Sequence, residues 1–467
     1  MSDRLLVRGG HVLTLAGSAG GSRRADVLVE DGRIAAVAPD LDASDCEVLD
    51  ARGGIVMPGF VDTHRHTWQT ALRGICADWT LLDYFRGIRL NISTELGPED
   101  MYAGNYVGAL EALDAGVTTL LDFSHCTNTP EHADEAIRGL RESGIRSVFA
   151  FGFPNTSLQD WWFGPDYAGS VLEIDGDLAR RIRAQYFNSD DGLITMALAT
   201  RGTNFCREEV VRNEWGLAKE LGLNITVHVA MYRFGYTKMQ LSKLKEMDLL
   251  FPNTTYIHSS HLLDDEWAMV RDSGSNVSYA PQIELQMGHG WAQAVTARDY
   301  GVPIGLSSDV ATTASSDQFT QMHAIFASER ARRYEIAWDE NLEWNEPESK
   351  LITSRDVLAM ATIGGAKVAG IADRTGSLTP GKKADLVIID TKAVNVAPVI
   401  DPVGAVVCAA DISNVRTVMV DGQILKDDFR LKADLAQPRK LVEESRDYLV
   451  SKFGAPEPGW LPTAVTA

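Results

Sequence analysis

A regular alternation of strand-like and helix-like segments through the middle of the chain does most to constrain the fold. Helical patterns, for example at 98–116 and 264–273, separate several mostly apolar segments. An alternation of this kind is typical of parallel sheets whose strands are buried on both faces. Eight such strands predict an α/β fold of the (β/α)8 TIM-barrel type. The strand-like segments are 55–64, 116–124, 146–153, 192–199, 223–230, 254–260, 276–281 and 303–309.

The two ends of the chain share a different pattern. Short alternating strands fill the first 55 residues, and similar segments return at 384–390 and 415–425. An Asp–Gly pair, the usual chemistry of a tight hairpin turn, separates apolar runs at 31–32 and again at 421–422. Both ends are therefore expected to form one small β-sandwich domain. The predicted domains are this composite domain (1–55 and 375–435), the barrel (56–374), and a C-terminal helix and tail (436–467).

Composition argues against several classes of protein. A net charge of −20 disfavours nucleic-acid binding, which rests on clustered Lys and Arg. No segment has the length of a membrane span or the apolar core of a signal peptide. The five cysteines lie far apart without a CxxC pair, which indicates a reducing compartment. We therefore expect a cytoplasmic protein without a membrane or nucleic-acid partner. We also expect a homo-oligomer, either a dimer or a tetramer.

Polar residues lie at the carboxyl ends of several of the predicted strands. His64 and His66 end the first strand, and side chains two residues apart on a strand point the same way. Further along, His228, His258 and Asp309 lie at the ends of the fifth, sixth and eighth strands. Each histidine alone could be an ordinary core or loop residue. Together they favour one site at the mouth of the barrel, where catalytic groups of such folds lie, and neutral imidazole is a common zinc ligand.

Six stretches carry a resemblance to a known family. They are MPGFVDTHRH, TVHVA, IHSSHL, GLSSD, ATIGGAKVAG and GSLTPGKKADLVIID, and the similarity runs from residue 5 to about 425. On these motifs the chain resembles the amidohydrolase superfamily, and more closely its chlorotriazine hydrolases and aromatic-amine deaminases. The pairing of the first motif with the last is specific. The resemblance implies the same barrel and a small-molecule heterocyclic substrate.

The resemblance also implies a metal centre. Relatives with two metals bridge them through a carboxylated lysine on the fourth strand, and the segment 192–199 contains no lysine. One divalent ion per chain is therefore expected, with zinc first and iron or manganese as alternatives. The implied ligands of this ion are His64, His66, His228 and Asp309.

The implied chemistry is hydrolysis of a C–N bond in a heteroaromatic or cyclic amidine-like small molecule, as in an aminohydrolase. Metal-activated water would attack a ring carbon that bears the leaving group. Asp309 would take a proton from that water and return it to the leaving group. His258 would hydrogen-bond the water or the substrate.

One residue departs from the family pattern. Many relatives carry Glu three residues after the strand-five histidine, and here Met231 occupies that place. A thioether cannot transfer a proton. Glu284, just past the seventh strand, could replace this proton shuttle, or it could be an ordinary surface residue. Hydrolysis of a C–halide or cyclic amide bond, or a non-hydrolytic lyase or cyclase reaction, therefore stays open. Retention of all four ligands argues against an inactive scaffold.

Residues near the predicted mouth are candidates for substrate binding: Trp68, Gln69, Trp79, His125, Met231, His261 and His289. The tryptophans, with Trp161, Trp162 and Trp291, suit a flat aromatic substrate, and core packing is the alternative for each. Arg73 and Arg201 could hold a carboxylate or form surface ion pairs. Three further histidines are expected to be structural or exposed, namely His11, His132 and His323.

Overall fold

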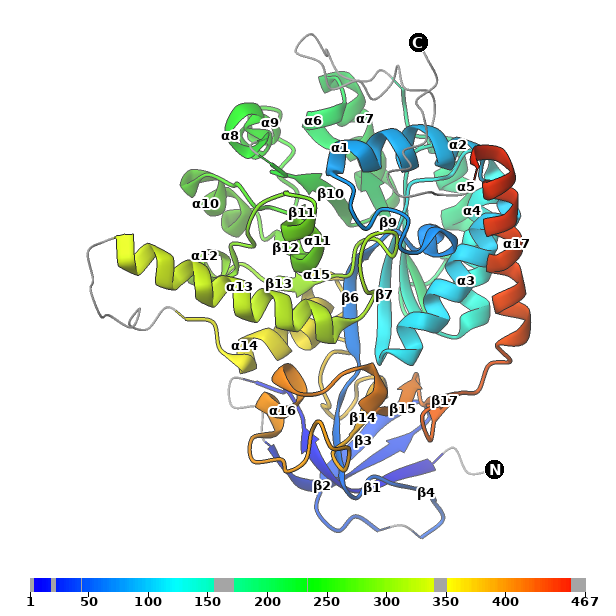
Figure 1. Cartoon of the computed structure of the whole chain (residues 1–467), viewed down its shortest axis with the longest axis vertical. Helices are drawn as coiled ribbons and strands as arrows, with labels where there is room; N and C mark the ends of the chain where they lie inside the picture. Colours follow the sequence, from blue (N-terminus) through cyan, green and yellow to red (C-terminus); the bar gives the residue numbers. More distant parts are fainter. Residues whose placement is uncertain are drawn as a thin grey trace.

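A parallel barrel forms the centre of the computed structural model, which describes residues 4–17, 22–42, 44–154, 172–232, 234–339 and 351–454 (Figure 1). Its sheet contains eight strands in chain order, and almost every strand residue is buried. The sheet closes where Arg65 bridges Asp309. The predicted (β/α)8 barrel is confirmed. Its strands are β6 (Phe60–Arg65), β7 (Val117–Ser124), β8 (Arg146–Phe151), β9 (Ile194–Thr200), β10 (Ile225–Val229), β11 (Thr255–His258), β12 (Asn276–Tyr279) and β13 (Ile304–Leu306).

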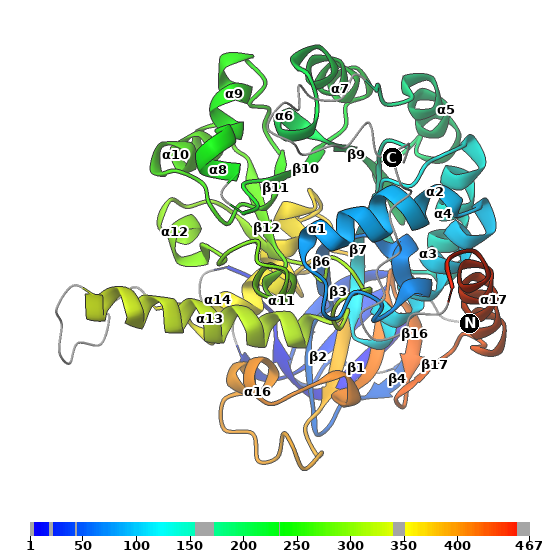
Figure 2. The same cartoon turned by 45° about the horizontal axis from the view of Figure 1, so that its top comes forward.

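Helices surround these strands, as Figure 2 shows. Pro98 and Pro130 stand in the first turns of α3 and α4, where a missing backbone N–H costs nothing. Gly144 ends α4 in the left-handed conformation, with φ of 78°. The helices up to β10 are η1 (Thr67–Leu72), α1 (Leu81–Tyr84), η2 (Phe85–Ile92), α2 (Ser93–Glu95), α3 (Pro98–Asp114), α4 (Pro130–Ser143), α5 (Gly176–Tyr186), α6 (Gly202–Phe205) and α7 (Glu208–Leu221).

Shorter helices predominate in the second half of the chain, and two of them directly follow the sixth and seventh barrel strands. These helices are α8 (Phe234–Lys238), α9 (Gln240–Glu246), α10 (Asp264–Asp272), α11 (Pro281–Gln286), α12 (Ala294–Asp299), α13 (Gln318–Asp339), α14 (Ser354–Ala359), η4 (Met360–Gly364), α15 (Gly365–Val368), α16 (Pro402–Cys408), η5 (Ile412–Asn414) and α17 (Ala436–Phe453). The longest, α13, extends away from the barrel in both views (Figures 1 and 2).

A second sheet, below the barrel in Figure 1, combines strands from both ends of the chain, as predicted. Its centre is the antiparallel pairing of β5 with β14, in which Val56 lies opposite Ile388. The two Asp–Gly pairs form hairpin turns with positive φ at both residues, as the sequence predicts. The strands are β1 (Arg4–Leu13), β2 (Ser22–Glu30), β3 (Arg33–Ala38), β4 (Glu47–Asp50), β5 (Gly54–Pro58), β14 (Leu386–Asp390), β15 (Val415–Val420), β16 (Gln423–Asp427) and β17 (Arg430–Leu431).

A buried ion pair joins the barrel to this terminal sheet. Arg146, at the start of β8, donates from Nε to Asp385 Oδ2 at 2.6 Å and from Nη2 to Asp385 Oδ1 at 3.1 Å. The same carboxylate accepts the backbone N–H of Asp421 at 2.7 Å. Because both charged side chains are buried, the pair fixes the bottom of the barrel against the sheet.

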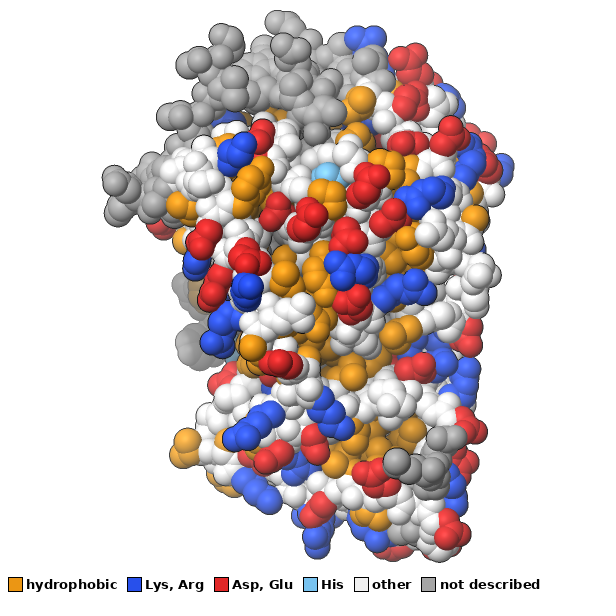
Figure 3. All heavy atoms as spheres, turned by 90° about the vertical axis from the view of Figure 1, so that its right-hand side faces the viewer, with side chains coloured by type: hydrophobic (Ala, Val, Ile, Leu, Met, Phe, Trp, Pro, Cys, Tyr) orange, Lys and Arg blue, Asp and Glu red, His pale blue; other side chains and the backbone are white. Residues whose placement is uncertain are grey.

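Figure 3 shows the face on the right of Figure 1, where α17 lies, and acidic and basic side chains are interspersed over it. None of the helices that the structure describes is both long enough and apolar enough to cross a membrane.

Candidate metal centre and active site

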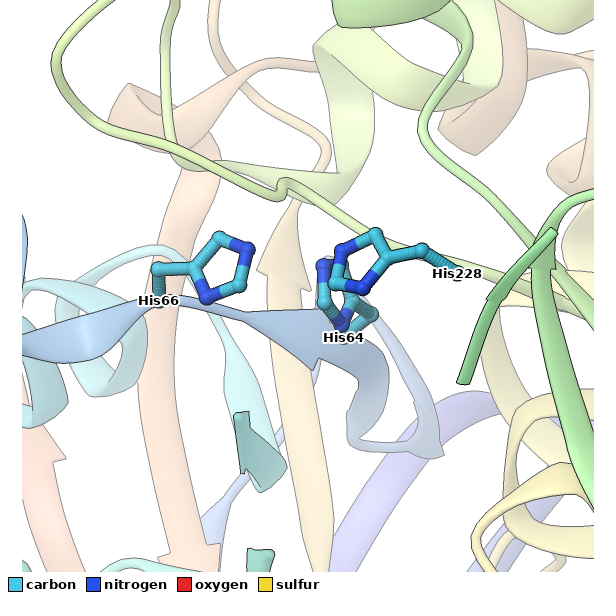
Figure 4. Close-up of side chains that lie close together, drawn as sticks. All are labelled: His64, His66 and His228. Atoms are coloured by element: carbon cyan, nitrogen blue, oxygen red, sulfur yellow. The ribbon is translucent and has the colours of Figure 1, made fainter. Parts of the chain in front are cut away.

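Three histidines converge at the carboxyl ends of the barrel strands. β6 presents His64 and, one residue beyond its end, His66, while β10 presents His228 from the facing side. One nitrogen from each ring lies within 4.8 Å of the others. Figure 4 shows the three rings turned toward one common region. Backbone hydrogen bonds to neighbouring strands fix the positions of β6 and β10, so the barrel itself brings the three rings together.

Asp309 completes the cluster. Its Oδ1 lies 3.3 Å from Nε2 of His64 and 3.5 Å from Nε2 of His66. Two backbone hydrogen bonds hold it there, because the Asp309 N–H donates to the His64 carbonyl and the Asp309 carbonyl accepts from the His66 N–H. Burial opposes ionisation, but the contact with His64 outweighs it and holds the pKa of Asp309 well below its usual range.

The histidines have the chemistry of metal ligands. Burial lowers the pKa values of His66 and His228 well below the ordinary value, so both rings are neutral, the form that binds metals. Nδ1 of His66 lies 3.2 Å from the Phe123 carbonyl oxygen and donates to it, which leaves Nε2 as a lone-pair donor. Within the described part of the chain, Nδ1 of His64 is buried without a hydrogen-bond partner. Three nitrogens and one carboxylate suit a zinc-like ion.

A buried carboxylate aligns the two ligand-bearing strands. Asp62 accepts hydrogen bonds from both the backbone N–H (3.1 Å) and the hydroxyl of Ser308. Asp62 precedes His64 by two residues, and Ser308 immediately precedes Asp309. The contact therefore fixes the relative position of the first and last metal-ligand candidates.

His258 and Glu284 form a second buried pair beside this cluster. His258 ends β11, and its Nε2 lies 3.8 Å from Asp309 Oδ2. Its Nδ1 lies 3.2 Å from Oε1 of Glu284, which also accepts the Ala280 N–H at 2.8 Å. Glu284 lies on α11 and is fully buried, and burial raises its pKa well above the usual value. The alternative of a surface residue at this position is therefore wrong.

A cavity of about 540 Å³, its mouth included, opens onto the histidine cluster. Besides the cluster, polar groups of Tyr84, Thr200 and His289 line it, together with His125 and two arginines. Most of the remaining wall is apolar, formed by Leu81, Phe85, Phe153, Phe205, Met231 and Met287.

His125 presents a hydrogen-bond donor to this cavity. The indole nitrogen of Trp68 donates to Nδ1 of His125 at 3.3 Å. An indole N–H can only donate, so Nδ1 carries no proton and the ring is neutral with its proton on Nε2. Its ring stacks on that of His66, with 4.1 Å between the centroids. His125 therefore offers a fixed N–H next to the histidine cluster.

Four predicted substrate contacts do not line the cavity. Trp68 lies behind His125, and Gln69 donates to the Tyr84 hydroxyl at 2.6 Å, so both support residues that reach the cavity. Trp79 is buried outside the cavity wall. His261 packs beside Tyr236, with 5.4 Å between the ring centroids. The structure thus places His125, Met231 and His289 at the cavity and these four residues around it.

The other tryptophans, one arginine and three histidines singled out in the sequence complete the comparison. Trp161 and Trp162 lie outside the described residues, and Trp291 is 47% exposed. Arg73 forms a surface ion pair with Glu111. Of the other histidines, His323 is exposed, His11 is partly buried, and His132 is buried with Nε2 2.8 Å from the Leu96 carbonyl oxygen.

Sequence reasoning missed one charged residue of the cavity, Arg89, and most of its aromatic wall. These residues lie between the first strand and α3, or follow the third and fourth strands. One feature of the sequence could have indicated Arg89, because this arginine stands inside the mostly apolar run GIRLNI. A charged residue in such a run is buried only with a specific role.

Relatives named as deaminases align along nearly the whole chain. The 5'-deoxyadenosine deaminase of Methanosarcina mazei is 27% identical over 96% of this chain and 97% of the relative. The 5-methylthioadenosine/S-adenosylhomocysteine deaminase of Symbiobacterium thermophilum is 29% identical over 91% and 94%.

Solved structures share the fold. A zinc-bound adenosine deaminase from Xanthomonas campestris has a TM-score of 0.78 at 22% identity, covering 96% of this chain and 98% of that one. A triazine hydrolase from Arthrobacter aurescens has a TM-score of 0.82 at 22% identity, covering 96% and 100%. The model of the Amidohydrolase family matches residues 55–425, which include the barrel and extend into the terminal sheet. The chain belongs to the amidohydrolase family, as its motifs predicted.

Proposed function

We propose that the protein is a mononuclear metal-dependent hydrolase that removes an amino group from a heteroaromatic small molecule. The observation that carries the proposal is the convergence of His64, His66, His228 and Asp309 on a largely apolar cavity. The deaminase names of the relatives support the same reaction class. A divalent ion held by these four side chains, zinc in the first place, would supply Lewis acidity and a water molecule ionised near neutral pH.

The chain's own groups would move the protons. Asp309 has its second oxygen toward His258, so it is placed to take a proton from the attacking water and return it to the leaving amine. The N–H of His125 would donate to an acceptor on the substrate ring. Glu284 does not line the cavity and acts through His258, which makes it a positioning residue whose hydrogen bond sets the orientation of that imidazole.

Met231 favours a second candidate reaction. Its side chain lines the cavity three residues after His228, where many relatives have a glutamate that protonates the ring. Some substrates, such as those with a C–halide or a cyclic amide bond, can lose their leaving group without protonation of a ring nitrogen. Such a substrate would not need that glutamate. A lyase or cyclase reaction is the further alternative.

An ammonia-release screen tests the proposal. Pure protein of known metal content would be incubated with purine nucleosides, pyrimidines, pterins, triazines and indole-type amines, and chloride release would be followed for chlorotriazines. We expect ammonia from at least one amine, and none after His228→Ala. Chloride release without ammonia would replace the proposed reaction by the second candidate. The same preparation tests the predicted dimer or tetramer by its mass in solution.

A further inference from the structure

His289 brings a buried imidazole to the cavity without a hydrogen bond to either ring nitrogen. It follows α11 and lines the same cavity as Met231 and Asp309. Only 2% of its surface is exposed, and within the described part of the chain Nδ1 and Nε2 both lack a partner. Leaving buried polar atoms unpaired destabilises a folded protein, so we expect this imidazole to find its partner in the molecule that the cavity binds.

Backbone contacts fix the imidazole beside the reacting groups. The His289 N–H donates to the Glu284 carbonyl at 2.8 Å, and the His289 carbonyl accepts the N–H of Tyr232 at 2.8 Å. Its ring packs edge to face against that of His258, with 4.5 Å between the centroids. Nε2 of His258 in turn lies 3.8 Å from Oδ2 of Asp309. The imidazole therefore lies one ring away from the carboxylate that is placed to take a proton from water.

The other imidazoles of the cavity already have partners or roles. Nδ1 of His125 accepts the indole N–H of Trp68, and Nδ1 of His258 contacts a buried carboxylate. The remaining two belong to the metal-ligand cluster. Among the described residues of the cavity and outside that cluster, His289 alone is an imidazole with both nitrogens available. A neutral imidazole has one N–H and one lone pair, so such a ring can accept a proton on one side while it releases another on the opposite side.

We propose that His289 carries a proton from the attacking water to a ring nitrogen of the substrate. Deamination uses both protons of the water: one leaves with the ammonia, for which Asp309 is placed, and the other ends on the ring nitrogen beside the attacked carbon. As the water oxygen bonds to that carbon, the electron pair of the C=N bond moves to the nitrogen, which takes the N–H proton of His289. The opposite nitrogen of the imidazole takes the proton that the water loses. The imidazole ends neutral in its other tautomer, and solvent restores the first one after product release.

The inference rests on the proposed function, and His289→Gln tests it in the full chain with its metal. Glutamine has both a donor and an acceptor but cannot transfer a proton. The assay uses the amine that releases ammonia fastest among the purine nucleosides, pyrimidines, pterins, triazines and indole-type amines, and kcat should fall by about 10²- to 10⁴-fold. His132→Gln, at a buried histidine that contacts the Leu96 carbonyl, is the control and should keep its kcat. Unchanged kcat in a folded, metal-loaded His289→Gln protein overturns the inference.

A second substitution separates proton transfer from a structural role. Met231 lines the same cavity, and the next residue, Tyr232, is the one that donates to the His289 carbonyl. Met231→Glu therefore introduces a proton carrier next to the one that His289→Gln removes. It should raise the kcat of His289→Gln about tenfold more than it raises the kcat of the original protein. An equal gain in both proteins, or no gain in either, contradicts the inference.

Added imidazole provides the test if His289→Gln fails to fold. His289→Ala leaves space for a free imidazole, which should restore ammonia release in proportion to its concentration, and a lack of recovery contradicts the inference. Ammonia release by the original protein separates the two proposals. If no amine releases ammonia, the proposed function fails and this inference fails with it. If ammonia is released and His289→Gln does not slow the reaction, the function stands and the inference alone fails.

Discussion

Replacing Glu284 by glutamine tests whether the buried His258–Glu284 pair contributes to turnover. The carboxylate accepts the Ala280 N–H at 2.8 Å and lies 3.2 Å from Nδ1 of His258. Glutamine has the same shape and can keep the Ala280 hydrogen bond through its carbonyl oxygen. The same oxygen would keep the contact with Nδ1 of His258, because Oε1 makes both contacts, and the amide nitrogen would take the place of Oε2. An amide neither takes up nor releases a proton near neutral pH, so the variant keeps the geometry of the pair and removes its proton exchange.

The size of the effect follows from the position of the pair. A group that orients or serves proton transfer contributes about 10²- to 10⁴-fold to turnover, or about 3–5 kcal/mol of the activation barrier. Glu284 itself does not line the cavity, so substrate binding should change little. We therefore expect kcat to fall by about 10²- to 10⁴-fold while KM stays within about threefold of its original value.

The assay compares Glu284→Gln with Glu266→Gln, using steady-state ammonia release, metal analysis and thermal unfolding on each protein. Glu266, on helix α10, is a matched control because it is also buried and accepts a backbone N–H, that of Leu241 at 3.2 Å. Both variants should keep the metal, and only the first should lose turnover. Near-original turnover in a folded, metal-loaded Glu284→Gln protein would refute the reasoning.

Four further outcomes are expected. Metal analysis should find close to one divalent ion per chain, and two ions at full occupancy would contradict the single-site assignment. His228→Ala should lose both metal and turnover, whereas His132→Ala should keep both and lower only the unfolding temperature, since His132 bonds a carbonyl far from the cluster. Met231→Glu should raise ammonia release from common heterocycles, and no increase would favour the C–halide or cyclic-amide reaction. Asp385→Asn should lower the free energy of unfolding by about 1.5–3 kcal/mol in chemical denaturation, because it removes the closer of the two carboxylates that pair with buried Arg146 and leaves only Asp421 at 3.4 Å.

The barrel was predictable because buried parallel strands are continuous apolar runs, and a polar residue ending such a run stands out. This is why the candidate ligands on β6, on β10 and after β13 could be found without coordinates. The predicted last strand was too long, since β13 ends at Leu306 and residues 307–308 belong to no strand. Backbone hydrogen bonds of Asp309 to the first strand replace a regular ladder there.

The cavity wall was less predictable, because it comes from segments whose path depends on tertiary packing. Trp68 and Gln69 lie two and three residues after His66, which suggested that they reach the cavity. However, η1 turns the chain there, and both side chains contact residues that line the cavity instead. The burial of Glu284 likewise depends on which side of a six-residue helix faces His258, and no sequence period fixes that for so short a helix.

The sheet shared by the two ends has a consequence for biosynthesis. β5 pairs with β14, so Val56 meets Ile388 only after roughly 330 further residues have been made. At ~5–20 residues per second, a ribosome needs roughly 15 to 65 seconds for that interval. Throughout it, one edge of β5 has open backbone donors and acceptors, which can pair with another nascent chain. The yield of correctly folded protein therefore depends on how well that edge is shielded until the last strands emerge.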